Sequence, residues 1–193
     1  GDDEIISTEQ AIEWFNIESI GKSPAKFDFT KLDHINQHYI QNTDGAELID
    51  LSKNIYETRF GIVPDAQAKE MILECIDEFK ERAKTLVQFV DESVFFAKSI
   101  PYEFDDKADK ILSAQDAREV ISALLNHFSD LQDFTPEGVE TTCRTVAEKI
   151  RDGKLGKIGM PLRAALTGGT ASPSIFHIAA VLGQEKTCAR LKY

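Results

Sequence analysis

The stretch PDAQAKEMILECIDEFKERAKTLVQFV, residues 64–90, decides the fold class of this chain. Apolar residues recur in its first half at spacings of one, three and four: Met71, Ile72, Cys75, Ile76 and Phe79. This spacing is typical of the buried face of an α-helix. After a break, Leu86, Phe89 and Val90 continue the same face. We therefore predict a helical element that opens at Pro64-Asp65 and is the longest of the chain.

Helix signals of the same kind extend in both directions, and strand signals are nearly absent. Further apolar stripes each follow a residue that can cap the start of a helix. These residues are Ser7, Asp28, Asp44, Ser113, Thr135 (before Pro136) and Ser172 (before Pro173). A helix begun at Ser172-Pro173 should stop at Gly183 and be followed by a final one. The sequence thus predicts an all-α protein with two small helical bundles, residues 44–110 and 111–193, after a helical leader at 1–43.

Length and composition indicate a soluble globular chain. Its 193 residues are 42% hydrophobic and 28% charged, and no run of about 18 apolar residues could span a membrane. The acidic start does not resemble a secretory signal, and a start at Gly1 suggests a piece of a longer protein. Cys75, Cys143 and Cys188 are far apart and odd in number, which favours buried free thiols in a reducing compartment, the cytoplasm.

Charge is distributed unevenly along the chain. The formal net charge is −11, which by itself opposes binding to nucleic acid. Residues 141–193, however, hold nine Lys or Arg and three Asp or Glu, a net of +6, so that the remainder carries −17. Such a difference fits either ordinary variation of helical surfaces or two faces that meet different partners.

Motifs of catalysis are missing from the sequence. It has no nucleophile elbow, no P-loop and no dinucleotide-binding glycine pattern. His34 and His38 can share a helix face, but no third ligand lies nearby, so we expect no metal site. The chain is therefore interpreted as a binding module. Its most distinctive segment is 154–182, where Ser172 is expected to cap a helix whose first N–H groups are free to meet phosphate or a base edge.

Two motifs resemble a known family, the bacterial glutamyl-tRNA synthetases. The first is SPAKFDFTKL at residues 23–32 with Asn36 and Tyr39-Ile40 after it, which is similar to the segment that follows the family's catalytic domain. The second is MPLRAALTG at residues 160–168, then Ser172-Pro173 and Leu182-Gly183, which resembles the signature near the family's C-terminus. The motifs stand in the family's order, with helical sequence between them, so the resemblance covers essentially the whole chain.

The resemblance implies a division of labour within a longer protein. Members of this family join glutamate to its tRNA with ATP and magnesium, in an N-terminal domain that carries HIGH and KMSKS signatures. Neither signature occurs in this sequence, so the chain should be inactive alone and should hold no cofactor. It corresponds to the C-terminal helical cage, whose partners are the anticodon stem-loop of tRNA and the N-terminal catalytic domain. We expect a monomer.

Site residues follow from the same resemblance. Arg82 matches a family arginine that points at the third anticodon base, and Arg163 matches the arginine beside the anticodon bases. The loop and helix start that read the middle and last bases correspond to Ser172, Pro173, Ser174 and Ile175, although the family more often has Gly at 174. Arg144 matches a basic helix position near the loop backbone. Arginine suits these roles because its planar fork of donors fits base edges and phosphates.

Structural roles are also open to these arginines. Arg82 could pair with Glu78 one helical turn earlier, and Arg163 could cap the end of a neighbouring helix. Two other functions remain open for the chain as a whole. It could be a helical protein-interaction domain, or the equivalent module of a related enzyme that places glutamate on glutamine tRNA. Because glutamate and glutamine anticodons differ at the third base, an arginine at position 82 is expected to favour the glutamate anticodon.

Overall fold

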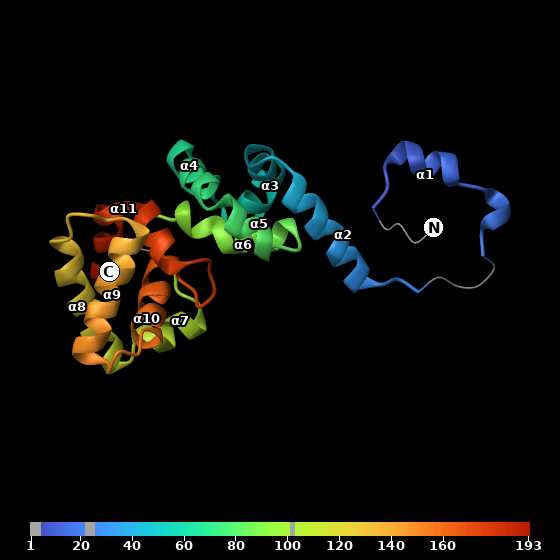
Figure 1. Ribbon diagram of the computed structural model, residues 1–193. Helices are drawn as coiled ribbons and strands as arrows, with labels where there is room; N and C mark the ends of the chain where they lie inside the picture. Colours follow the sequence, from blue (N-terminus) through green and yellow to red (C-terminus); the bar gives the residue numbers. More distant parts are fainter. Residues whose placement is uncertain (1–4, 22–25, 101–102) are drawn as a thin grey trace.

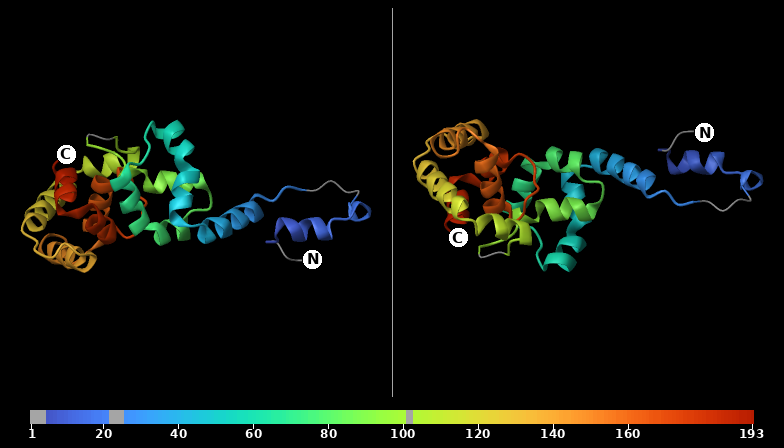
Figure 2. Two further views of the ribbon diagram at one scale, coloured as in Figure 1. Left: turned by 90° about the horizontal axis from the view of Figure 1, so that it is seen from above. Right: turned by 90° about the horizontal axis from the view of Figure 1, so that it is seen from below.

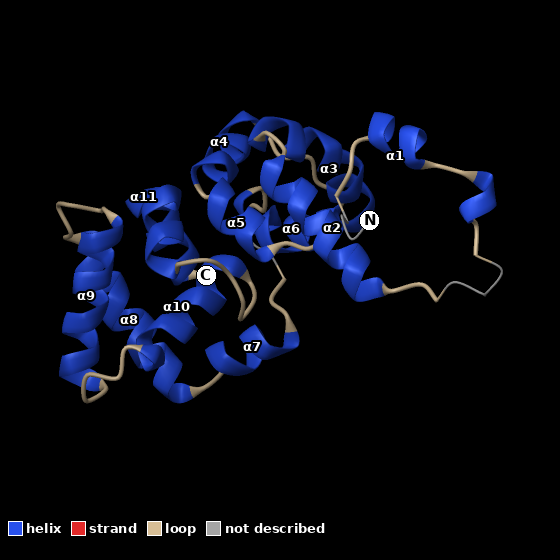
Figure 3. Ribbon diagram, turned by 45° about the vertical axis from the view of Figure 1, so that its right-hand side comes forward, coloured by secondary structure: helices blue, strands red, loops and turns tan. Residues whose placement is uncertain are grey.

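The described part of the chain is helical throughout. The computed structural model describes residues 5–21, 26–100 and 103–193, and within these ranges it contains helices and no strands (Figures 1 and 3). The all-α prediction is confirmed. Three sequence features lie outside the described residues: the acidic start at 1–4, the Ser23-Pro24-Ala25 portion of the first motif, and the Pro101 break.

The leader comprises α1 (Thr8–Trp14), η1 (Ile17–Ser19) and α2 (Phe29–Asn42). Its N-terminal part, α1 and η1, lies away from the two bundles, and α2 leads from it to the first bundle (Figures 1 and 2). Both expected caps form, since Ser7 accepts a hydrogen bond from the Gln10 N–H, and Asp28 accepts from the N–H groups of Thr30 and Lys31. No residue of α1 is buried. The end of α2 packs on α5, which joins the leader to the first bundle.

The first bundle consists of α3 (Gly45–Phe60), α4 (Ala66–Glu74), α5 (Ile76–Arg82), α6 (Leu86–Ser93) and η2 (Val94–Phe96). The prediction that Pro64-Asp65 opens the longest element is wrong, because residues 64–90 form three helices. Cys75, at φ −102° and ψ 12°, interrupts the helix between α4 and α5. Ala83 is extended, and Thr85 then caps α6 by accepting from the Gln88 N–H. The apolar face continues through these breaks, so the pattern located the core correctly.

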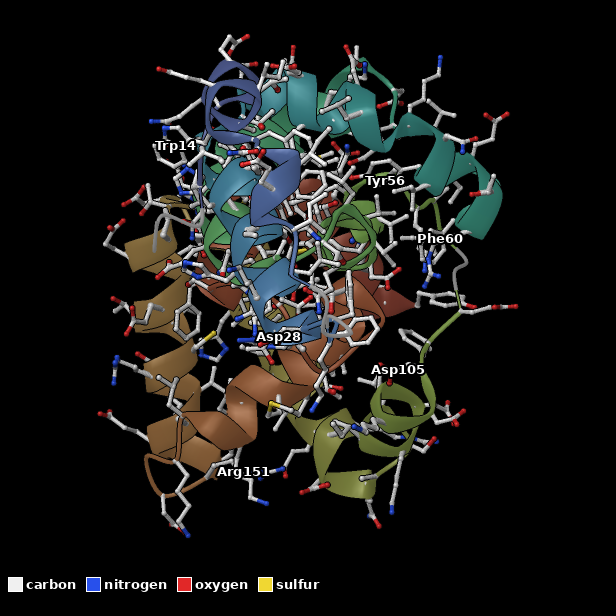
Figure 4. All side chains as sticks on the ribbon, turned by 90° about the vertical axis from the view of Figure 1, so that its right-hand side faces the viewer. Trp14, Asp28, Tyr56, Phe60, Asp105 and Arg151 are labelled. Carbon is white, nitrogen blue, oxygen red and sulfur yellow. The ribbon has the colours of Figure 1, made fainter. Side chains whose placement is uncertain are left out.

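Aromatic side chains fill the core of this bundle. Phe79 lies within 6.4 Å, centroid to centroid, of Phe89, Phe95 and Phe96. Tyr56 of α3, labelled in Figure 4, is fully buried. Its hydroxyl is hydrogen-bonded to the Ser93 hydroxyl at 2.5 Å. Burial raises the pKa of Tyr56 to about 12, so its hydroxyl stays protonated over the physiological range.

The second bundle consists of α7 (Asp106–Leu112), α8 (Gln115–Ser129), α9 (Pro136–Ile150), α10 (Gly156–Thr167) and α11 (Ile175–Lys192). The Thr135-Pro136 start of α9 is confirmed, with Pro136 in its first turn. The expected interruption at Gly183 is also confirmed, because its φ of 78° and ψ of 162° leave helical geometry inside α11. The predicted division at 110/111 falls inside α7, which packs on α10 and α8.

A buried arginine connects the two bundles. Arg190 of α11 is 5% exposed, and its guanidinium donates to the Leu166 carbonyl at the end of α10. It also donates to the carbonyls of Phe95, at 2.7 Å, and Lys98, at 3.2 Å, around the end of η2. One side chain therefore supplies donors to helix-end carbonyls of both bundles, groups that are costly to leave unpaired when buried.

The cysteines are free and buried, as predicted. Among the described residues, no three His, Cys, Asp or Glu side chains are grouped so that they could hold a metal ion. A search of the same residues finds no helix with the length and apolarity needed to cross a bilayer.

Replacing Arg190 should destabilise the whole chain. Arg190→Ala leaves helix-end carbonyls of both bundles without this donor, so we expect a loss of about 3 kcal/mol or more in the free energy of unfolding. Urea unfolding monitored by circular dichroism measures this. Arg118→Ala, which removes an exposed arginine from α8, should change stability by less than about 0.5 kcal/mol. Equal effects of the two substitutions would contradict the structural role of Arg190.

Two of the thiols should resist alkylation. Burial is the main reason that the pKa values of Cys75 and Cys143 are raised to about 12. At pH 8 a thiol with that pKa is ionised at about one part in 10,000, so iodoacetamide should modify these residues roughly a thousandfold more slowly than a free thiol. Peptide mapping after native and denatured labelling measures this. Rapid native labelling at either site contradicts the burial.

Candidate functional site

Arg82 ends α5 and is anchored by the next helix. Its Nε donates to the Glu92 carboxylate of α6 at 2.7 Å, in an ion pair whose acid is largely buried and whose arginine is 40% exposed. The alternative partner considered from the sequence, Glu78, is occupied elsewhere. Glu92 fixes one edge of the guanidinium, and the exposed remainder of the planar group can face a ligand.

Arg163 of α10 points at the loop that precedes α11. Its Nη1 donates to the backbone carbonyl of Ser172 at 3.0 Å and lies 3.2 Å from the Ser172 hydroxyl. Its Nε is buried, and the described residues offer it no acceptor. Burial lowers the pKa of Arg163, and the neighbouring cation of Arg82 lowers it further. The structure therefore brings together the two arginines that the sequence placed 81 positions apart.

Residues 172–175 form a tight turn into α11, but the cap differs from the predicted one. Ser172 and Pro173 are buried in the loop and do not start the helix; α11 begins at Ile175 with Ser174 at the N-cap position. The Ser172 hydroxyl donates to the Pro173 carbonyl at 3.0 Å and faces Arg163, so it cannot cap. The Ile175 side chain enters the core, which leaves the exposed Ser174 as the accessible side chain of this turn.

A carboxylate from the first bundle holds this turn. Glu78 of α5 accepts a hydrogen bond from the Ser174 backbone N–H at 3.0 Å, and its other oxygen is paired with Nδ1 of His177. The Ser174 N–H is thus already occupied, whereas no side-chain cap bonds the first N–H groups of α11 itself. Sequence reasoning missed the roles of Glu78 and His177. The sequence does show Glu78 one helical turn before Arg82, but from the sequence alone Glu78 was interpreted only as a partner for that arginine.

The end of α10 directs the loop back toward Arg163. Gly168 adopts a left-handed conformation, with φ 75°, and its carbonyl accepts from the Asp105 N–H at 2.8 Å. The Thr167 hydroxyl donates to the Arg163 carbonyl at 2.9 Å. A Cβ on Gly169 would lie 3.2 Å from the Asp105 carboxylate, so this approach favours glycine. The Thr-Gly-Gly sequence therefore has a structural reason, which is to reverse the chain at the site.

Arg144 is not part of this cluster. It lies on α9 and forms an ion pair with Glu140 one turn earlier, an arrangement that leaves most of its side chain exposed. The described residues give it no contact with Arg82, Arg163 or the 172–174 turn. Its predicted contact with the RNA backbone stays a prediction.

The arrangement presents hydrogen-bond donors to an acceptor-rich ligand. The turn is fixed by hydrogen bonds at both ends, by Arg163 at Ser172 and by Glu78 at Ser174. The cation of Arg82, one turn after Glu78 on α5, is close enough to lower the pKa of Arg163. Among the described residues, the site contains no activated nucleophile and no group of side chains that could hold a metal ion. It can bind a group with exposed oxygen acceptors or negative charge, and it can position that group accurately.

Comparison with known proteins gives consistent matches. The sequence profile of the family described as "Anticodon binding domain" matches residues 38–193. A "Glutamate--tRNA ligase 2" of Parvibaculum lavamentivorans is 42% identical and aligns with 100% of this chain and 39% of its own length. Another "Glutamate--tRNA ligase 2", of Rhodospirillum centenum, is 44% identical over 99% of this chain and 40% of its own length. The chain thus spans about two fifths of these relatives.

A solved structure shares the fold. The crystal structure of a glutamate tRNA ligase from Elizabethkingia meningosepticum, in complex with its amino acid, superposes with a TM-score of 0.72 at 27% identity. The match covers 98% of this chain and 36% of that protein.

Proposed function

We propose that this chain, which belongs to the anticodon-binding domain family, binds the anticodon loop of glutamate tRNA. In this proposal it is the C-terminal part of a cytoplasmic, monomeric glutamate–tRNA ligase. The observation that carries the proposal is that Arg163 holds the 172–174 turn at Ser172, while Glu78, one turn before Arg82 on α5, holds it at Ser174. Unstacked loop bases are read by this kind of donor, through hydrogen bonds to their edges.

Electrostatics support an RNA ligand at this site. Two neighbouring guanidiniums repel each other, and a phosphate or a base with exposed oxygens placed between them relieves that repulsion. The buried Nε of Arg163, which lacks an acceptor, gives a further reason for the side chain to reorient when such a group arrives. Glu92 keeps Arg82 near the site without neutralising its exposed edge.

In this proposal Arg82 reads the third base and thereby favours the glutamate anticodon over that of glutamine. Arg163 and residues 172–175 contact the other two bases, through backbone groups and the short Ser174 side chain. Arg144 contributes at most a contact with the RNA backbone.

The chemistry of ligation is proposed to take place outside these 193 residues. The sequence lacks the HIGH and KMSKS signatures, and the described residues contain no cluster suited to a metal ion. ATP and magnesium are therefore assigned to the N-terminal catalytic domain of the ligase. No step of the reaction is assigned to this chain, whose contribution is to select and hold the tRNA.

The leader supplies a surface for that catalytic domain. Large apolar side chains along it are more than half exposed: Ile12, Phe15, Ile17, Ile20, Phe27, Phe29 and Tyr39. So many exposed apolar groups in one short segment are typical of a surface covered in the complete protein. We propose that the leader packs against the N-terminal portion of the ligase.

Anticodon stem-loops test the proposed function directly. We expect the chain to bind a stem-loop with the glutamate anticodon more tightly than one with the third base changed, with affinity that falls as salt is raised. Arg163→Ala should weaken binding by about 10- to 100-fold. Arg82→Ala should bring the ratio of the Kd values for the two stem-loops close to one, because it removes the group proposed to read the third base. Fluorescence anisotropy titrations measure both effects.

The control is Arg118→Ala, which removes the same charge from α8. It should weaken binding far less than Arg163→Ala and preserve discrimination. Absence of binding to either stem-loop contradicts the proposed function. Binding that Arg82→Ala leaves fully discriminating contradicts the role assigned to Arg82.

A further inference from the structure

Glu78 lies in a chain of hydrogen bonds that reaches Arg163, and it shares a helix face with Arg82. It occupies the same face of α5 as Arg82, one turn earlier. Its carboxylate accepts from the Ser174 N–H and is paired with His177. Two residues before Ser174, the Ser172 carbonyl accepts from Arg163, whose guanidinium neighbours Arg82. Hydrogen bonds therefore run from α5 through the turn to α10, and the repulsion between the Arg163 and Arg82 cations acts back on α5.

We infer that Glu78 is a positioning residue that couples the reading of the third anticodon base to the reading of the other two. The inference rests on the proposed function, since it requires that Arg82 and the 172–175 turn contact the anticodon. It adds that these contacts do not act independently. A displacement of α5 moves Arg82 and, through Glu78, the turn that holds Arg163.

The contacts of Glu78 are placed to transmit such a displacement. The hydrogen bonds of Glu78 to Ser174 and His177 join α5 to the start of α11, across the boundary between the bundles. Arg82 is bonded to α6, within its own bundle, and Arg163 is bonded to the turn within the other bundle. Glu78 is therefore a hydrogen-bonded connection between the two sets of proposed base-reading groups.

The surroundings of Glu78 make the carboxylate effective in this role. About one third of its side chain is exposed, so its hydrogen bonds are partly shielded from water and are correspondingly strong. Both of its oxygens are engaged, one by the Ser174 N–H and one by His177. It therefore holds the turn without competing with RNA for Arg82, which is paired with Glu92 instead.

A cycle of base changes measures the coupling. Four stem-loops are needed: the glutamate anticodon, a changed third base, a changed middle base, and both changes together. For each changed stem-loop, the weakening is the factor by which its Kd exceeds that of the glutamate stem-loop. With the unaltered chain, we expect the product of the two single-change weakenings to exceed the double-change weakening by about fivefold or more. The reason is that one misplaced base already loosens the contacts that position the other reading groups. Glu78→Ala should bring this ratio to about one, so that the two base changes act independently. It should also reduce the affinity for the glutamate stem-loop.

Two further variants separate positioning from general loss of structure. Glu81→Ala removes the same charge from the same helix at an exposed position and should keep the fivefold factor. Glu78→Gln retains one carbonyl oxygen for the Ser174 N–H and should restore part of the coupling. Thermal unfolding of each variant, monitored by circular dichroism, identifies a temperature at which all remain folded, and the titrations are made there.

The outcomes distinguish this inference from the function on which it rests. Failure of the unaltered chain to bind or to discriminate among the stem-loops overturns the proposed function, and the inference with it. Discrimination with independent base effects, or with coupling that survives Glu78→Ala, overturns only the role of Glu78. Loss of coupling in Glu78→Ala but not in Glu81→Ala supports it.

Discussion

The guanidinium of Arg190 satisfies carbonyl groups that the folding of two separate bundles would otherwise leave buried without donors. The carbonyl of Leu166 belongs to the last turn of α10, and those of Phe95 and Lys98 surround the end of η2. A shift of one bundle against the other breaks some of these bonds. α10 carries Arg163, and α5, which carries Arg82, belongs to the bundle that ends in η2. The bonds of Arg190 therefore help to fix the distance between α5 and α10, the two helices that supply the arginines of the candidate site.

The aromatic core adds to the same constraint. Phe95 and Phe96 pack against Phe79 of α5 and belong to a buried cluster that continues into the second bundle. The orientation of α5, and with it the place of Arg82, therefore depends on close packing as well as on hydrogen bonds. Local signals fixed the helices, whereas the site depends on contacts between residues nearly a hundred positions apart.

This difference explains what the sequence could and could not predict. The all-α fold and the caps at Ser7, Asp28, Asp44 and Thr135 follow from interactions within four residues, which a sequence displays directly. The breaks at Cys75 and Ala83 were concealed by apolar residues that continue across them. The partners of Glu78 were also concealed, because no local pattern indicates that an acid on α5 will meet the N-terminus of α11. Ser172 was misassigned as a cap for a related reason, since its hydroxyl is engaged by Arg163, a residue of the preceding helix.

Arg163 also bears on the thermodynamics of the site. Its guanidinium has already lost much of its hydration in the folded chain, and one of its buried N–H groups has no acceptor. The free-energy cost of dehydrating that cation is therefore borne by folding and need not be met again when a ligand arrives. Dehydration of a cation before binding lowers the free-energy cost of association with a ligand. An N–H group buried without an acceptor costs free energy in the folded chain, and the bond from Arg163 to Ser172 offsets part of that cost.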